Sequence, residues 1–381
     1  MSNDDDATFI PRYLKNIEYQ IANCTDQDDL NVLLAKKAGY LARHSVVHEA
    51  RSIIRGLRDR NKNYDPKLTG WTTFSEGLII HFENLDNQGS KSKFARSLMM
   101  GKVAQDNELT SASAVWLANS EYALGELKSS IKHLGMSIQL SLPMDGDTRG
   151  RAFLLLGDML YWCGKPELAR HWYRESRKHA VRDGDIAMQN IILFNTANYA
   201  VWNLTLQDCR GPLNSNDWRL VSLEVASARN LNSALRINNL PSLIPTMEAE
   251  LRVIQRNWRD SEDIFGKTLR QLGEDGLQRA VSKMFAQRAW CRANLRDTNG
   301  ARSDIADALL QISDCEDLDD LYVLHSRVSS ASAVVGDSDV SDRHHRIARE
   351  CGQLFFDQQE RTYASLAQIL GLLASETKNP A

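Results

Sequence analysis

The chain has 381 residues, 43% hydrophobic and 25% charged, and its 46 basic and 49 acidic residues give a net charge of −3. This composition can bury a core, and it fits neither a membrane protein nor a disordered chain. Because the charge is nearly balanced, nucleic acid and anionic lipid are not expected as main partners. With only 8 prolines and 21 glycines, turn residues are scarce, which argues against an all-β fold.

The first residues, MSNDDDATF, are acidic where a signal peptide would be basic and then apolar. No apolar run approaches the roughly 20 residues of a membrane-spanning helix. We therefore expect a cytoplasmic protein with a flexible acidic N-terminus at residues 1–8. The six cysteines are scattered without any C-x-x-C pair, so reduced thiols are expected.

An internal repeat is the most informative feature of the sequence. The repeat has a small residue on a first helix, followed on a second helix by a small, a large apolar and another small residue. In the clearest copy these residues are Gly157, Ala169, Tyr173 and Ser176, with a turn at 164–166. Small residues let the paired helices approach closely, and the large residue fills the space between pairs.

The repeat recurs along the chain with a period of about 40 residues. The small-residue positions on the predicted first helices are Ala38, Leu78, Ala118, Gly157, Ala197, Ala249, Ala289 and Ser329. The fifth pair is predicted to be enlarged, with a second helix that uses Ser227, Leu231 and Ala234. The eighth pair is the least regular, because His345 occupies its large apolar position.

At these residues the chain resembles the tetratricopeptide repeat (TPR) family, in a long variant of roughly 40 residues rather than the usual 34. The resemblance covers most of residues 25–356. It implies an all-α fold, a right-handed α-solenoid of about eight stacked antiparallel helix pairs, which a helix at 358–375 caps. We expect one such domain over 9–375, with a possible hinge at 207–217 and a flexible tail at 376–381.

Two short segments imitate ligand-binding loops. Gly266-Lys267-Thr268 imitates the end of a phosphate-binding loop, but Ser261 stands where that loop requires a glycine. Asp145 and Asp147 imitate the start of a calcium loop, but Arg149 stands where an oxygen ligand belongs. We interpret both segments as ordinary parts of the helical repeat.

Two histidine pairs and one acidic segment are the candidate metal sites in the sequence. His44 and His48 have the spacing of a zinc pair, but the repeat places a turn between them and no third ligand is apparent. His344 and His345 are adjacent and face different directions on a helix. The acidic segment 314–320 favours capping of the following helix, and magnesium binding is its alternative interpretation.

An all-α enzyme is the remaining catalytic alternative. Asn216 and Glu224 have two of the metal-ligand spacings of terpene cyclases, but Leu220 occupies the position of the hydroxyl ligand. The sequence also lacks a recognisable nucleophile and base or a cofactor loop. We therefore predict no enzyme activity, no cofactor and no metal.

In a stack of such pairs the first helices line the concave side, so positions just after each small residue are predicted to face a groove. The predicted groove residues combine polar and aromatic side chains: Asn119, Tyr122, Arg151, Asp158, Tyr161, Trp162, Asn198, Trp202, Glu250 and Trp290. Asparagine can pair with both backbone groups of an extended peptide, and Trp, Tyr and Arg often anchor interfaces. Packing between repeats is the competing interpretation for Tyr122, Tyr161 and Trp202.

The polar members of this set, Asn119, Asp158, Asn198 and Glu250, are expected to face solvent or a ligand. An unpaired buried amide or carboxylate would cost about 1–3 kcal/mol or more. TPR proteins that grip a chaperone's C-terminal carboxylate use several basic residues on first helices. Only Arg151 is basic here, so that clamp is not expected.

A basic patch follows one second helix and is interpreted as a solvated convex face: Arg170, Arg174, Arg177, Lys178 and Arg182. The sequence therefore favours a non-enzymatic scaffold, adaptor or regulatory subunit that holds a protein or peptide segment in the concave groove. The alternative is a ligand- or peptide-responsive sensor module of a bacterial signalling system. No nucleic acid or membrane partner is expected.

Overall fold

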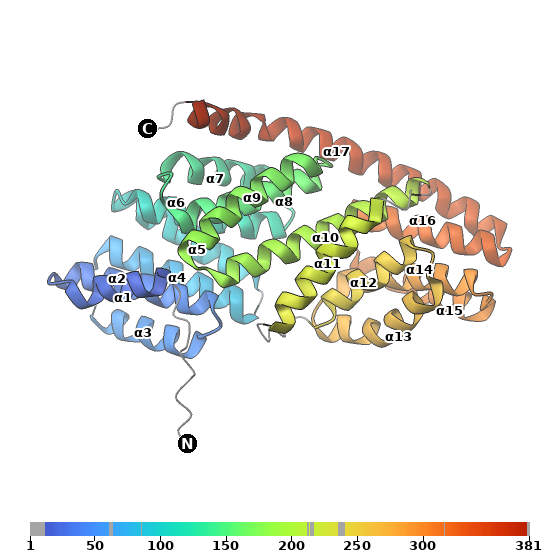
Figure 1. Cartoon of the computed structure of the whole chain (residues 1–381), viewed down its shortest axis with the longest axis horizontal. Helices are drawn as coiled ribbons and strands as arrows, with labels where there is room; N and C mark the ends of the chain where they lie inside the picture. The colour runs from blue at the N-terminus through green and yellow to red at the C-terminus, as the bar shows by residue number, and fades with distance from the viewer. Residues whose placement is uncertain are drawn as a thin grey trace, which may run out of the picture. The chain divides into compact units, whose positions relative to one another are not determined.

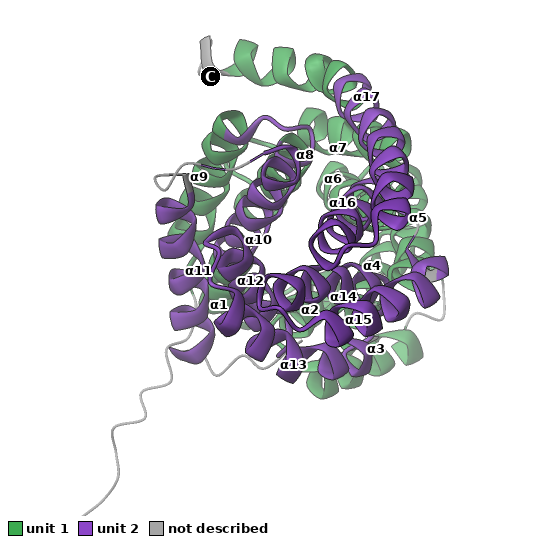
Figure 2. Ribbon diagram, turned by 90° about the vertical axis from the view of Figure 1, so that its right-hand side faces the viewer, with its two compact units in different colours: residues 1–160, 167–192, 362–381 green, residues 161–166, 193–361 purple. Residues whose placement is uncertain are grey.

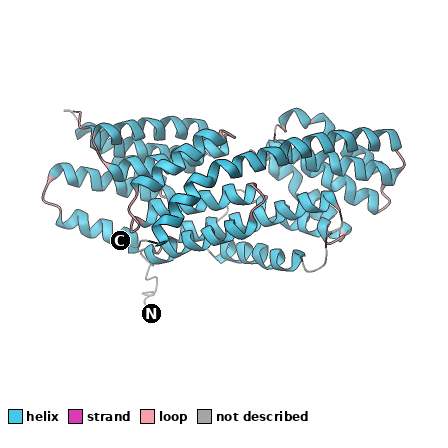
Figure 3. Ribbon diagram, turned by 90° about the horizontal axis from the view of Figure 1, so that it is seen from above, coloured by secondary structure: helices cyan, strands magenta, loops and turns pink. Residues whose placement is uncertain are grey.

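A computed structural model describes residues 12–60, 64–84, 86–211, 213, 217–234, 241–315 and 317–378. Over these residues the chain has seventeen α-helices, one short 3₁₀ helix at Ile312–Asp314 and no strand (Figure 3). The all-α prediction is therefore confirmed for the described part of the chain.

The helices form eight successive pairs (Figure 1). The first helices are α2 (Gln27–Arg43), α4 (Pro66–Asn84), α6 (Asn107–Ala123), α8 (Gly146–Trp162), α10 (Ile186–Arg210), α12 (Leu243–Ile254), α14 (Gln278–Asn294) and α16 (Leu318–Val335). The second helices are α3 (Val47–Arg60), α5 (Asn87–Val103), α7 (Leu127–Leu140), α9 (Pro166–Asp183), α11 (Asp217–Ala234), α13 (Trp258–Glu274), α15 (Thr298–Leu310) and α17 (Ser338–Lys378). Since α4, α6 and α8 begin at residues 66, 107 and 146, the predicted repeat length is confirmed, and the fold is a TPR-like helical repeat.

The two ends of the repeat array differ from the prediction. Helix α1 (Arg12–Asn23) precedes the first pair and has no counterpart in the predicted repeats. Residues 358–375 are helical as expected, but they continue α17 without a break. The preceding segment, 352–357, contains neither a proline nor a cluster of turn residues, so nothing local ends the helix there.

The chain divides into two compact units (Figure 2). Unit 1 comprises Met1–Leu160, Glu167–Ile192 and Thr362–Ala381, and unit 2 comprises Tyr161–Pro166 and Leu193–Arg361. The divisions fall within α8, α10 and α17 or next to the turn after α8. The predicted flexible N-terminus 1–8, the last three residues of the predicted tail 376–381 and parts of the predicted hinge, 212 and 214–216, lie outside the described residues. Residues 376–378 of the predicted tail are helical and belong to α17.

The small residues of the repeat lie where paired helices touch. On the second helices Ala50, Ser90, Ser130, Ala169, Ser261 and Ala301 are all completely buried. Ser130 Oγ donates a hydrogen bond to the carbonyl oxygen of Ala118 at 2.6 Å, and Ser261 Oγ donates to that of Ala249 at 2.9 Å. Each serine replaces alanine at its position without leaving a buried hydroxyl unpaired, because the first helix supplies an acceptor.

The same contact explains the glycine in the clearest repeat. A Cβ atom at Gly157 would lie 2.5 Å from ring carbons of Tyr173, which is the large residue of that pair. The ring therefore packs directly against the backbone of α8, and only glycine permits this approach.

Two predicted registers are wrong. In the fifth pair Ser227 is exposed, and the second helix instead buries Val221, Val225 and Ala228. The prediction placed serine at the buried small position, but the valines and alanine form the apolar stripe that packs in the core of this pair.

In the eighth pair the predicted core residue His345 is exposed, and His344 is buried in its place. His344 pairs with His325 of α16, with 2.9 Å between their Nδ1 atoms. The adjacent histidines do face different directions, as expected, but the inward one is the other member of the pair.

Within the described residues, no helix is both long enough and apolar enough to cross a membrane.

Candidate binding face on the first helices

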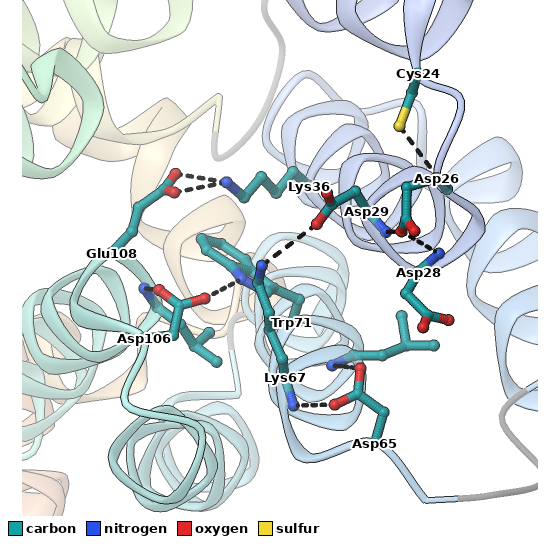
Figure 4. A network of polar contacts seen from close by, with 12 residues as sticks. Cys24, Asp26, Asp28, Asp29, Lys36, Asp65, Lys67, Trp71, Asp106 and Glu108 are labelled. Atoms are coloured by element: carbon teal, nitrogen blue, oxygen red, sulfur yellow. Dashed lines mark hydrogen bonds and ion pairs between the residues drawn. The ribbon is translucent and has the colours of Figure 1, made fainter.

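In unit 1, side chains from three successive first helices meet in a polar ladder (Figure 4). Lys36 of α2 donates hydrogen bonds to both carboxylate oxygens of Glu108 on α6, each at 2.7 Å. Its ammonium group also lies 4.6 Å from the centre of the Trp71 ring on α4. The indole of Trp71 in turn donates to Asp106 at 3.1 Å. Each contact joins side chains from two different repeats, so neighbouring repeats hold these side chains in place.

A second set of charges in unit 1 surrounds Arg43, at the end of α2. Its guanidinium forms an ion pair with Asp147 of α8, and a second one with Asp185 at 3.4 Å. Burial alone would raise the pKa of Asp185, but the charge of Arg43 and a hydrogen bond from His44 hold it well below its ordinary range. Arg43 and Asp185 are therefore both charged and interlocked.

The polar ladder of Lys36 and the charged residues around Arg43 border a cavity of about 250 Å³ in unit 1. Helix α1 contributes Tyr13, and the first helices contribute Tyr40, Trp71 and the charged groups described above. The turn before α8 contributes Asp145. The cavity thus has aromatic walls and several fixed charges.

The predicted groove residues of unit 1 lie on α6 and α8. Asn119 and Tyr122 are half-buried, and the Tyr122 hydroxyl lies 3.5 Å from the carbonyl oxygen of Asp158. Arg151 is buried, with its guanidinium carbon 4.2 Å from the centre of the Trp116 ring. Burial and the positive charge of Arg43 lower the pKa of Arg151 to about 10. Arg151 therefore stays protonated at neutral pH.

In unit 2 the structure brings together three predicted groove residues, Tyr161, Trp162 and Trp202. The Trp162 and Trp202 rings both meet Phe355 of α17 edge to face, at 5.4 and 6.0 Å between ring centres. Tyr161 stacks on Tyr199 of α10 at 5.8 Å. Tyr161 is almost fully buried while both tryptophans are half-buried, so packing between repeats is part of their role.

The indole of Trp202 links this aromatic cluster to a chain of charges on neighbouring first helices. It donates to the carboxylate of Asp319 at 2.7 Å. The adjacent Asp320 pairs with Lys283 of α14 at 2.6 Å. Burial and the neighbouring charge of Asp320 raise the pKa of Asp319.

The chain of charges continues through Glu250, which accepts a hydrogen bond from Gln287 at 3.3 Å. Gln287 Oε1 accepts from Arg327 Nε at 2.8 Å, and the Arg327 guanidinium pairs with Asp208 at 2.7 Å. The carboxylate of Asp208 is completely buried, and Arg256 holds its other side with two hydrogen bonds of 2.7 and 3.1 Å. One polar network therefore joins four first helices, α10, α12, α14 and α16.

Trp290, another predicted groove residue, lies between two members of this network. The guanidinium carbons of Arg327 and Arg256 lie 4.1 and 4.7 Å from its ring centre. Trp290 itself is half-buried, and the Arg256 side chain is 38% exposed. Trp290 and Arg256 are therefore solvent-accessible members of this network.

The expectation that all four polar groove positions face solvent or ligand is wrong for Asp158 and Glu250. Both are buried, at 6% and 7% exposure. Asp158 accepts a hydrogen bond of 2.5 Å from the Tyr173 hydroxyl, and Glu250 accepts one from Gln287. The expected free-energy cost applies only to buried polar groups without a hydrogen-bond partner, and both carboxylates accept a hydrogen bond. Asn198 is exposed, as expected.

Five charged residues of these contacts are not predicted from the sequence: Lys36, Arg43, Glu108, Asp208 and Arg327. Lys36 and Glu108 are 72 positions apart and Asp208 and Arg327 are 119 positions apart. Their common signal is that all lie on first helices, at positions not next to the small residues. A search for opposite charges on first helices one or two repeats apart could have found Lys36 and Glu108.

No family model matches the sequence, and a comparison with curated proteins finds no match. Among solved structures the chain is similar to the apo form of RapI, with 11% sequence identity and a TM-score of 0.48. The match covers 89% of this chain and 91% of that chain.

Proposed function

We propose that the chain is a cytoplasmic, non-enzymatic binding module of the long-repeat TPR type. In this proposal the first-helix faces hold an extended segment of a partner protein, and the chain acts as an adaptor or regulatory subunit. The predicted groove residues Asn198, Trp202 and Trp290 would contact that segment in unit 2. In unit 1 the half-buried Asn119 would contact a partner segment.

The observation that carries the proposal is the polar network that joins α10, α12, α14 and α16 through Asp208, Glu250 and Arg327. Burying so many charges is costly, and an apolar core of similar volume would usually be as stable. The network does, however, fix the orientation of half-exposed groups such as Trp290 and Arg256. A surface whose side chains are already ordered loses less entropy when it binds a partner.

The perturbed carboxylates also favour binding over catalysis. Asp185 is held by Arg43, and Asp319 by the Trp202 indole, so neither is a free base positioned against a nucleophile. Within the described residues, no group of three or more His, Cys, Asp and Glu side chains is placed to hold a metal ion.

A peptide-display selection on the full chain tests the proposal. We expect a common sequence to be enriched, and hydrogen exchange with a selected peptide to show new protection on first helices such as α10 and α14. Protection confined to the second helices α11, α13 and α15, or no enriched sequence, would contradict the proposal. Small-angle scattering with the same peptide separates the two modes: an unchanged radius of gyration favours an adaptor, and compaction favours the sensor alternative.

A further inference from the structure

A groove of about 560 Å³ in unit 2 carries a surplus of positive charge. Helix α17 supplies most of its lining, and the end of α10 and the start of α16 supply the rest. The charged residues of the lining are Arg210, Arg346, Arg349 and Glu350. Three arginines and one carboxylate give this groove a net charge of +2, in a chain whose overall charge is −3.

The three arginines of this groove form no ion pair within the described part of the chain. Unit 1 offers a comparison, because a groove of about 430 Å³ there is also lined by arginines. In that groove Arg51 pairs with Glu83 and Arg58 pairs with Glu76. In unit 2, by contrast, both arginines of α17 are exposed, so an acidic partner can reach them without breaking an ion pair of the folded chain.

Arg210, the third arginine, is held in place while most of its donors stay available. Its guanidinium carbon lies 3.8 Å from the centre of the Phe356 ring, so the group stacks on that ring. The Tyr322 hydroxyl accepts a hydrogen bond from it. A guanidinium carries its N–H donors along the edge of a planar fork, and stacking on one face leaves that edge open. Arg210 is therefore preorganised for a carboxylate, which such a fork binds with two hydrogen bonds.

The aromatic floor of the groove holds this stack. Tyr322 is buried and meets the Phe356 ring edge to face, at 5.7 Å between ring centres. A Cβ atom at Gly352 would lie 2.9 Å from a ring carbon of Tyr322, so glycine lets the tyrosine ring lie against the backbone of α17. The packed ring pair fixes Phe356 and, through the stack, Arg210.

Size and charge indicate which anion fits. A volume of about 560 Å³ equals that of roughly nineteen waters at about 30 Å³ each, which suits several side chains better than one inorganic anion. Anionic membranes attract clusters of about four to eight basic residues, and a nucleic acid backbone is likewise bound through many cations. This groove has fewer basic residues and includes Glu350. A short segment with two carboxylates matches its surplus charge.

We infer that this groove binds an acidic segment of a partner protein, with carboxylate side chains of that segment paired to Arg210, Arg346 and Arg349. The site contains none of the predicted groove residues on the first helices. It is therefore a second binding surface, and it does not rest on the proposed function.

The test uses the full chain and the capped peptide acetyl-Gly-Glu-Gly-Glu-Gly-amide, with its glutamine counterpart as the neutral probe. We expect saturable binding of the glutamate peptide in calorimetric or NMR titration, and none of the glutamine peptide. Arg346→Gln with Arg349→Gln should weaken the glutamate peptide at least tenfold, and Arg210→Gln severalfold. Glutamine is a good helix former, so these variants keep their helices.

Arg259→Gln is the matched control. Arg259 is also exposed and forms no ion pair within the described residues of unit 2, but it lies on α13 and does not line the groove. This variant should bind the glutamate peptide like the wild type. Equal binding of the two peptides, full affinity in the groove variants, or an equal loss of affinity in the control would each overturn the inference.

Further probes separate the site from other anionic surfaces and from the proposed function. Binding to phosphatidylserine vesicles or to oligothymidine, without binding of the glutamate peptide, would assign the arginines to a lipid or nucleic acid surface and overturn the inference. If display selection yields no peptide that protects the first helices while the glutamate peptide still binds, the proposed function fails and the acidic-segment site stands. First-helix protection without any glutamate binding would remove the acidic-segment site alone.

Discussion

Replacement of Arg327 by methionine is the sharpest test of the polar network in unit 2. Arg327 is 2% exposed in its side chain and pairs with the completely buried carboxylate of Asp208 at 2.7 Å. Methionine keeps most of the length and volume of the side chain but removes its charge and its hydrogen-bond donors. The substitution therefore leaves Asp208 and Gln287 buried with fewer partners.

The remaining contacts of Asp208 determine how much stability the Arg327→Met variant should lose. Removing one partner of a buried ion pair typically costs 3–5 kcal/mol. Here Arg256 still donates two hydrogen bonds to Asp208, so we expect a loss near the lower limit, about 3 kcal/mol. If the loss arises from the stranded carboxylate, then Asp208→Asn in the Arg327→Met background should cost little more.

Chemical denaturation followed by circular dichroism measures these changes in all four members of the double-mutant cycle. We expect a coupling energy of at least about 2 kcal/mol between the two positions. A loss below about 1 kcal/mol in Arg327→Met, or strictly additive costs in the double variant, would show that the network does not hold unit 2 together.

Three further predictions concern packing and pH. Gly157→Ala should destabilise the chain by about 1–3 kcal/mol because its Cβ would meet the Tyr173 ring; increased stability, as helix propensity alone implies, would contradict this contact. Ala301→Leu should cost about 1–3 kcal/mol by overpacking a fully buried contact, and an unchanged denaturation midpoint would show that the repeat register is wrong. Burial and the neighbouring His344 lower the pKa of His325 to about 4 in the folded state. In the unfolded chain this histidine has the ordinary pKa of about 6.5, so between these two pH values it is protonated only when the chain is unfolded. Stability should therefore fall by roughly 3 kcal/mol between pH 7 and pH 4, and His325→Leu should lose most of this dependence; an identical pH profile in the variant would contradict it.

The helical repeat could be predicted because its rule is local. Gly157, Ala169, Tyr173 and Ser176 lie within one helix pair, and their sizes follow directly from the close approach of two helices. The rule failed at Ser227, where a valine stripe lies on another face of the same helix. A small polar residue alone does not specify burial when an apolar stripe is present.

The proposed binding face could be predicted only in part from the sequence. Trp162, Trp202 and Trp290 are candidates for it because they follow the small residues of the repeat. The pairing of Asp208 with Arg327 could not, because it joins residues 119 positions apart through the fold. Whether Glu250 is exposed or buried likewise depends on Gln287 in the next repeat, and no local pattern contains that information.

Calorimetric titration of a selected peptide tests the central claim most directly. Asn198 is exposed on the first helix α10, while Arg174 and Arg177 are exposed on the second helix α9. Asn198→Ala should leave thermal unfolding unchanged and weaken the peptide by roughly 1–3 kcal/mol, whereas Arg174→Ala with Arg177→Ala should bind it like the wild type. Full affinity in the asparagine variant together with lost affinity in the arginine variant would place the binding face on the second helices and contradict the account.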